Sequence, residues 1–133
     1  MLESTTTVSL LLYNSNYAGQ AIVRNHFPDW EYTPEVYYLC CLLHDIATTP
    51  KNLRATKLSF EYYGGMIAHD LITKHGGSQD LAESVTEAII RHQDFINNGM
   101  ITTVGQVLQL ATILGIPPGI ITDSKIIWVR MQN

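Results

Sequence analysis

The sequence carries little charge: only 15% of its 133 residues are Asp, Glu, Lys or Arg, against roughly 25% in typical soluble domains. Its eight Lys and Arg residues are scattered, so the chain lacks the clustered basic footprint of a nucleic-acid-binding protein. No apolar run approaches the roughly 20 residues of a membrane-spanning helix. The apolar segment 7–12 is too short for a secretion signal and has no basic flank. We therefore expect one soluble domain, with homo-oligomerisation left open.

Cysteine is also scarce, with only Cys40 and Cys41 in the chain. Adjacent residues on a helix point about 100° apart, so a disulfide between these two is not expected. Two buried thiols in a reducing compartment are the simpler interpretation. We expect a cytoplasmic protein.

The apolar periodicity predicts an all-α fold with five helices. They are expected over residues 19–26, 34–49, 59–75, 78–92 and 103–114. Thr33 and Pro34 form a typical helix start, and Pro50 is expected to stop the second helix. The third is expected to end at Gly76. Thr103-x-x-Gln106 matches a capping box for the fifth.

The third predicted helix contains two adjacent glycines, Gly64 and Gly65. Each costs roughly 1 kcal/mol relative to alanine in a helix interior. That cost suggests a close approach between helices or a gap near a site. The apolar residues expected to face the core are Phe60, Tyr63, Ile67 and Leu71.

Both ends of the chain differ from this helical pattern. Residues 1–18 show no helix caps and no clear periodicity. Gly115-Ile116-Pro117-Pro118-Gly119 breaks helix, and the β-branched residues that follow surround a turn signal at 122–125. We expect an irregular or short β-like C-terminal tail. The predicted division is 1–18, an incomplete helical domain at 19–114, and a tail at 115–133.

The dipeptide His44-Asp45 lies at the end of an otherwise apolar helix, after Leu42-Leu43. An imidazole beside a carboxylate is costly to bury without a partner, and a divalent metal ion can serve as that partner. A histidine at a helix end beside a solvated aspartate is the alternative, and on the dipeptide alone it is favoured because His-Asp is common by chance. On the dipeptide alone both interpretations stay open.

Two longer stretches extend the pattern. Residues 44–65, HDIATTPKNLRATKLSFEYYGG, and residues 86–94, TEAIIRHQD, closely resemble the cyanamide hydratases. The resemblance runs from about Gly19 to Leu114. It implies a helical bundle of the HD type that holds one metal ion, taken as zinc.

The resemblance also implies an activity and its residues. The family hydrates the nitrile of cyanamide to urea, which makes it a lyase, and zinc would supply hydroxide at neutral pH. His44 and Asp45 match the family's metal pair. His92 is a candidate for proton transfer or substrate contact, and Thr112 for holding water or substrate. Glu61 is a candidate for orienting a ligand histidine. Helix-end stabilisation explains His92 as well, and an ordinary early-helix glutamate explains Glu61.

The sequence departs from the family at both ends. No histidine precedes His26, and Leu11 stands where the resemblance requires a further ligand histidine. Gly115 stands where an aspartate is expected. Both breaks are abrupt, so we hypothesise that the ends are out-of-frame or unspliced sequence. We expect an incomplete site with weak or absent activity. The alternatives are a nucleotide phosphohydrolase of the HD type and a non-catalytic interaction module.

Overall fold

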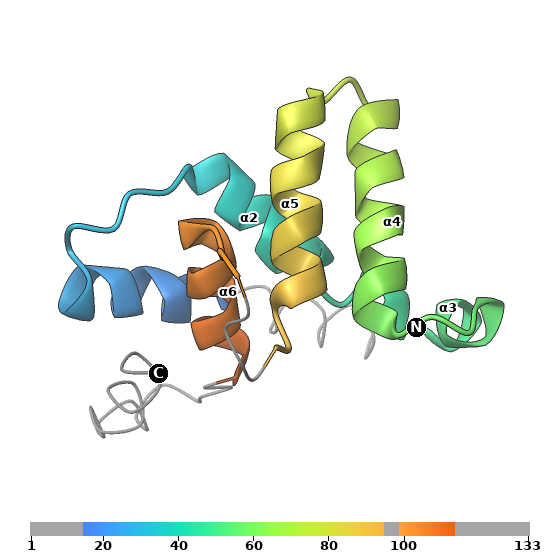
Figure 1. Cartoon of the computed structure of the whole chain (residues 1–133), viewed down its shortest axis with the longest axis horizontal. Coiled ribbons are helices and arrows are strands. Elements are labelled where there is room, and N and C mark those ends of the chain that lie inside the picture. Colours follow the sequence, from blue (N-terminus) through green and yellow to red (C-terminus); the bar gives the residue numbers. More distant parts are fainter. Residues whose placement is uncertain (1–14, 95–98, 114–133) are drawn as a thin grey trace, which may run out of the picture.

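The computed structural model describes residues 15–94 and 99–113, and within them all regular secondary structure is helical. A first helix at residues 15–26 is followed by α2 (Pro34–Leu43), the 3-10 helix η1 (Ile46–Thr48), α3 (Pro50–Ala55), α4 (Phe60–Lys74), α5 (Gln79–Arg91) and α6 (Thr103–Ile113) (Figure 1). The predicted all-α fold is confirmed. The predicted β-like tail, Leu11 and Gly115 lie outside the described residues. None of the described helices is long and apolar enough to cross a membrane.

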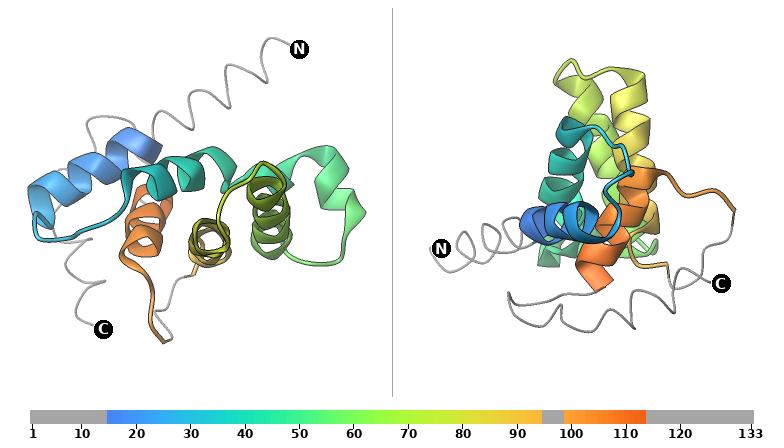
Figure 2. Two further views of the ribbon diagram at one scale, coloured as in Figure 1. Left: turned by 90° about the horizontal axis from the view of Figure 1, so that it is seen from above. Right: turned by 90° about the vertical axis from the view of Figure 1, so that its left-hand side faces the viewer.

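The helices α4 and α5 stand side by side as an antiparallel pair (Figures 1 and 2). Their connection is short because Gly76 adopts φ +85°, a conformation that glycine reaches without steric cost. The predicted end of the third helix is therefore confirmed. α6 packs on α5 on the side away from α4, α2 runs across α5 toward α4, and the first helix lies beside α2 and α6. α5 is thus the central helix of the bundle.

The core follows from the apolar face of α5, where Ala82, Val85, Ala88 and Ile89 are buried. α6 contributes Val107, Leu108, Leu110 and Ala111, which are all buried. α2 adds Tyr37 and the two thiols Cys40 and Cys41, which are free cysteines. Burial of this apolar surface stabilises the packed helices.

The predicted core face of α4 was wrong. The buried residues are Gly64, Gly65, Ala68 and Ile72, whereas Leu71 is 38% exposed. The small residues face inward because the helices approach closely. A Cβ atom on Gly65 would lie 2.8 Å from Cγ1 of Ile90 on α5. The predicted close approach at the glycine pair is confirmed.

The predicted role of Pro50 was also wrong in part. α2 already ends at Leu43, and Pro50 begins α3, a short helix that the sequence did not predict. Proline suits the first turn of a helix, and Thr49 caps it by accepting a hydrogen bond from the Asn52 amide at 3.3 Å. The turn after α2 is therefore held by a second helix rather than by a loop.

The start of α6 differs from the predicted capping box by one residue. Thr102 caps it, since its Oγ1 accepts a hydrogen bond from the Gly105 amide at 3.1 Å. The side chain of Gln106 donates to the Ile101 carbonyl instead of closing a capping box. The first helix also begins earlier than predicted, since residues 15–18 are already helical.

Candidate metal and catalytic site

His44 and Asp45 occupy the turn that joins α2 to η1. The amide of His44 continues the α2 hydrogen bonds by donating to Cys40 O at 2.9 Å. The His44 ring is buried, at 5% exposure, and its Nδ1 lies 2.9 Å from Cys41 O. A carbonyl only accepts hydrogen bonds, so Nδ1 carries the proton and the lone pair of Nε2 is left available. The Nε2 atom lies 3.4 Å from Asp45 Oδ2.

Side chains from η1, α3 and α4 hold this turn in place. Thr48 Oγ1 donates to Asp45 O at 2.8 Å, and Asn52 Nδ2 donates to Ile46 O at 2.8 Å. Gly64 of α4 packs next to Ala47, whose Cβ would lie at an ordinary contact distance of 3.5 Å from a Cβ on Gly64. The turn that carries the imidazole and the carboxylate is therefore fixed on both sides.

His92 comes to the same place from the far end of α5. It is the C-cap residue of that helix and is fully buried, at 0% exposure. Its ring centroid lies 5.3 Å from that of His44 and 5.7 Å from that of Phe60, with edge-to-face geometry in both pairs. We call His44, Asp45 and His92 the histidine–aspartate cluster. Residues 47 positions apart in the sequence thus form one site.

The ring nitrogens of His92 have different environments. Nδ1 lies 2.6 Å from Ile89 O and therefore carries the proton. Nε2 is buried with no hydrogen-bond partner among the described residues, and it lies 3.9 Å from Asp45 Oδ1. A buried polar atom without a partner is unusual and costly. This nitrogen faces the carboxylate as an available base.

Burial is the main influence on the proton affinity of His92, and it lowers the pKa of the imidazole below the ordinary value of 6.5. The Ile89 carbonyl opposes this effect, His44 lowers the pKa further, and Asp45 and Glu61 act to raise it. The net direction is downward, so His92 is neutral at pH 7. A neutral ring with a free Nε2 can accept a proton.

The two remaining candidates lie at the edge of the cluster. Glu61 is in the first turn of α4, one residue after Phe60, and its charge acts on His92. The hydroxyl of Thr112 lies 3.0 Å from Leu108 O on its own helix and 3.3 Å from His92 O. The structure therefore brings both predicted residues near His92, Glu61 through its charge and Thr112 through a backbone carbonyl.

The histidine–aspartate cluster fits a zinc ion in the chemistry of its donors but not in their number. The Nε2 atom of His44 and the carboxylate of Asp45 are suitable ligands, and the contact from His44 Nδ1 to a backbone carbonyl is typical of ligand histidines. A zinc site needs at least three protein ligands. In residues 15–94 and 99–113 no group of three His, Cys, Asp or Glu side chains is arranged to hold a metal ion.

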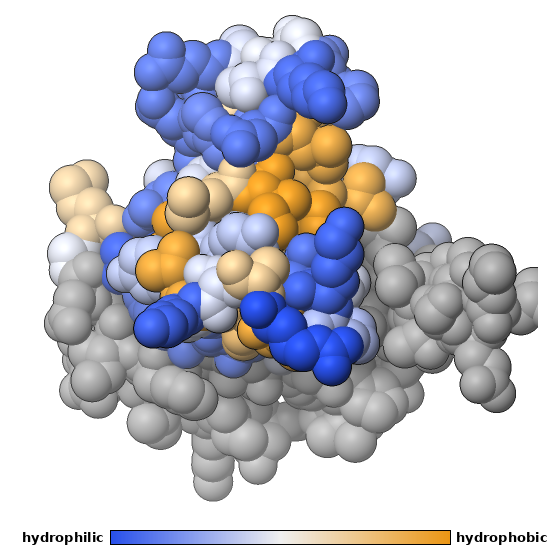
Figure 3. All heavy atoms as spheres, turned by 90° about the vertical axis from the view of Figure 1, so that its right-hand side faces the viewer, coloured by the Kyte–Doolittle hydropathy of each residue, from blue (hydrophilic) through white to orange (hydrophobic). Residues whose placement is uncertain are grey.

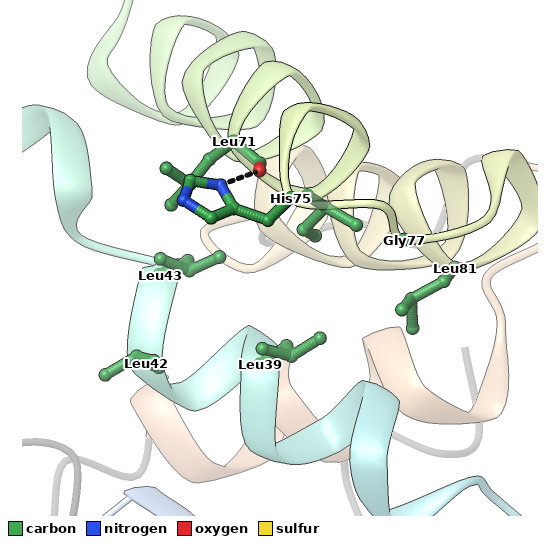
Figure 4. Close-up of a pocket in the computed structure, with 8 residues that line it drawn as sticks. Leu39, Leu42, Leu43, Leu71, His75, Gly77 and Leu81 are labelled. Carbon is green, nitrogen blue, oxygen red and sulfur yellow. Dashed lines mark hydrogen bonds between the residues drawn. The ribbon is translucent and has the colours of Figure 1, made fainter.

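A separate apolar pocket lies between α2, α4 and α5. Its volume is about 330 Å³, and it is lined by Leu39, Leu42, Leu43, Leu71, Ile72, His75, Gly77 and Leu81 (Figure 4). The ring of His75 is turned back onto Leu71 O at 2.8 Å. Hydrophobic side chains also gather on the surface below the polar turn between α4 and α5 (Figure 3). No member of the histidine–aspartate cluster lines this pocket, so it is not part of the candidate site.

The chain shares sequence similarity with two curated proteins of known name. The chain is 60% identical over 95 residues to the cyanamide hydratases DDI2 and DDI3 of Saccharomyces cerevisiae. It is similar to cyanamide hydratases. The match covers 71% of this chain and 42% of each yeast protein, so the chain spans less than half the length of these relatives. No protein-family model matches the chain.

The 95 residues matched by the yeast proteins include most of the candidate site. A stretch of 95 residues in a chain of 133 includes the middle of the chain wherever it begins, and with it His44, Asp45, Glu61 and His92. The predicted resemblance to cyanamide hydratases is thereby confirmed. The assignment to the HD type stays a prediction.

Sequence patterns did not identify two residues that support the site. Asn52 holds the turn after Asp45, and Gln109 of α6 bonds to the chain around His92. The available signal for Gln109 was a single amide within the apolar run Val107, Leu108, Leu110 and Ala111. A buried polar residue in such a run requires hydrogen-bond partners, but the backbone carbonyls that Gln109 contacts cannot be identified from a residue pattern.

Proposed function

We propose that the histidine–aspartate cluster is the core of a metal-dependent site that hydrates cyanamide to urea. The observation that supports this most directly is the free Nε2 of buried His92, which faces Asp45 at 3.9 Å. It lies within a chain that shares 60% identity over 95 residues with two yeast cyanamide hydratases. The substrate is a small polar nitrile. We further propose a fold of the HD type.

The two residues of the turn have the role of ligands. His44 and Asp45 would hold zinc, and zinc at this position would lower the pKa of a water molecule toward about 7. The carbonyl of Cys41 fixes the ring of His44 so that Nε2 points at the carboxylate of Asp45. Since this pair falls short of a complete ligand set, we expect weak zinc binding and weak activity from this chain.

The proton transfer is assigned to His92. Its Nε2 takes a proton from water as the water oxygen bonds to the nitrile carbon, and then gives that proton to the nitrile nitrogen. A further proton shift from oxygen to nitrogen gives urea, so atoms and charge balance without a redox partner. Glu61 acts on His92 through its charge. The hydroxyl of Thr112 is proposed to hold water or substrate.

The proposed compartment is the cytoplasm. Two buried free thiols, Cys40 and Cys41, support it, because such thiols persist where the environment is reducing.

The test measures urea formed from cyanamide at increasing zinc concentration, for the wild-type chain and two variants. In His92→Asn the shorter amide can still donate to Ile89 O, but Nε2 is removed. We expect a loss of about 100-fold in rate, the usual contribution of a proton-transfer group. The matched control is His26→Asn, since His26 is exposed and lies outside the cluster. It should retain the wild-type rate.

Two outcomes would contradict the proposal. Wild-type activity in His92→Asn would remove the assigned role of that ring. Absence of urea at saturating zinc, together with phosphate release from a panel of nucleotides, would favour a phosphohydrolase instead.

A further inference from the structure

Gln109 is a buried amide in the apolar face of α6, at 5% exposure. Its Nε2 donates to Asp94 O at 2.6 Å and lies 3.4 Å from Arg91 O. Both acceptors belong to α5 or to the turn that follows it, more than a dozen positions away in the sequence. An amide is costly to bury, so these contacts account for the presence of a glutamine at this position.

The acceptors lie on either side of His92. The last carbonyls of a helix have no partner within the helix and need one from elsewhere. At the end of α5, Arg91 O accepts from the Asp94 amide at 3.0 Å, and Nε2 of Gln109 adds a longer contact to the same carbonyl and a hydrogen bond to Asp94 O. The hydroxyl of Thr112, one turn further along α6, lies 3.3 Å from His92 O itself. The backbone on both sides of His92 is therefore held from α6.

The ring of His92 depends on this backbone. Its only hydrogen bond among the described residues runs from Nδ1 to Ile89 O, within its own helix. Nothing therefore ties Nε2 directly to α2, although it lies 3.9 Å from Asp45 Oδ1. The distance between the base and the carboxylate therefore depends on where the end of α5 is placed and on how the ring packs against His44 and Phe60. Gln109 contributes to that placement through its 2.6 Å hydrogen bond to Asp94 O.

We infer that Gln109 is a positioning residue for His92, which fixes the turn at Arg91–Asp94 so that Nε2 of His92 faces Asp45. The effect of Gln109 on catalysis rests on the proposed function, but its effect on the position of the His92 ring does not. Gln109 itself has no contact with substrate in this role.

The test compares Gln109→Met with Gln106→Met in the full chain. Methionine keeps the length of the side chain and removes the amide donors. Gln106 is the matched control because it lies on the same helix and also donates to a carbonyl, Ile101 O at 3.1 Å, away from α5. The first readout is the pair of ring ¹⁵N resonances of each histidine, which report the tautomer and surroundings of the ring. The second is kcat and KM for urea formation.

We expect Gln109→Met to shift the ring signals of His92, leave those of His26 and His75 unchanged, and lower kcat about 10- to 100-fold with KM nearly unchanged. Gln106→Met should match the wild type in both readouts. Wild-type ring signals of His92 in folded Gln109→Met would overturn the inference. If the wild type forms no urea, the ring signals still decide the role of Gln109 and only the proposed function fails. If Gln109→Met does not fold, Gln109→Asn gives the same readout, because it keeps the donors but shortens their reach.

Discussion

The adjacent glycines Gly64 and Gly65 provide a matched test of how the structure determines stability. Both lie in the interior of α4, where alanine is more favourable than glycine by about 1 kcal/mol. Their surroundings differ. A Cβ on Gly64 would lie 3.5 Å from the nearest atom, Ala47 Cβ, which is an ordinary contact. A Cβ on Gly65 would lie 2.8 Å from Ile90 Cγ1, so the Ile90 side chain or the packed helices must shift.

These distances predict different changes in the free energy of unfolding for the two substitutions. We expect Gly64→Ala to stabilise the chain by about 1 kcal/mol, the full difference in helix propensity. Gly65→Ala gains the same amount but forces overpacking that costs about 1–3 kcal/mol. Its net effect should range from neutral to about 2 kcal/mol destabilising. Gly65→Ala should therefore be less stable than Gly64→Ala by about 1–3 kcal/mol.

Guanidinium unfolding followed by circular dichroism measures both variants under the same conditions. A change in midpoint at constant slope reports stability alone. The source of the cost can be tested with Ile90→Ala, which removes the atoms that the new methyl group would meet. In that background the cost of Gly65→Ala should fall. Equal stability of Gly64→Ala and Gly65→Ala would refute the close approach of α4 and α5.

Three further predictions concern the core around Tyr37. Gly19→Ala should destabilise the chain by about 2–4 kcal/mol, because the new Cβ would lie 1.8 Å from Tyr37 Oη. It would break the buried hydrogen bond that the Tyr37 hydroxyl donates to Ser15 O, and an unchanged unfolding midpoint would contradict this. Burial raises the pKa of the Cys41 thiol from 9.0 to about 11 and that of Cys40 further. The two thiols should leave stability unaffected between pH 7 and 9 and lower it as the pH rises toward 11, because they lose protons first in the unfolded chain. Unfolding curves at pH 7–10.5 check the slope, and a flat profile would contradict this expectation. Both thiols should resist iodoacetamide at pH 8 until the chain unfolds, and rapid double alkylation of the folded chain would show that they are accessible.

Much of the helical fold could be predicted because its signals are local. The proline that begins α2, the glycine after α4 and the apolar period of α6 are signals of this kind, whereas the hydroxyl of Thr33 makes no capping hydrogen bond to α2. The face of α4 could not be predicted in this way. Hydrophobicity favours Tyr63 and Leu71 as core residues, but the buried face carries Gly64, Gly65, Ala68 and Ile72, and the close approach of α5 leaves no free space at Gly65. That constraint comes from a neighbouring helix and is not visible in the α4 sequence.

The candidate site was predictable to a similar degree. The pair His44-Asp45 is adjacent in the sequence, so its pattern could be recognised directly. The approach of His92 to Asp45 depends on how α5 packs against α2, and the supporting bonds from Gln109 depend on α6. The tautomer of each ring depends on a backbone carbonyl three residues earlier. Such contacts follow from the packed structure rather than from a residue pattern.

Zinc binding tests the central claim most directly. Equilibrium dialysis of the full chain over a range of zinc concentrations measures the ions bound per chain, for the wild type and for His44→Ala, Asp45→Ala and the control His26→Ala. We predict one saturable site in the wild type and in the control, and its loss in both variants of the turn. Undiminished zinc binding in His44→Ala and Asp45→Ala would contradict the assignment of this pair as the core of a metal site.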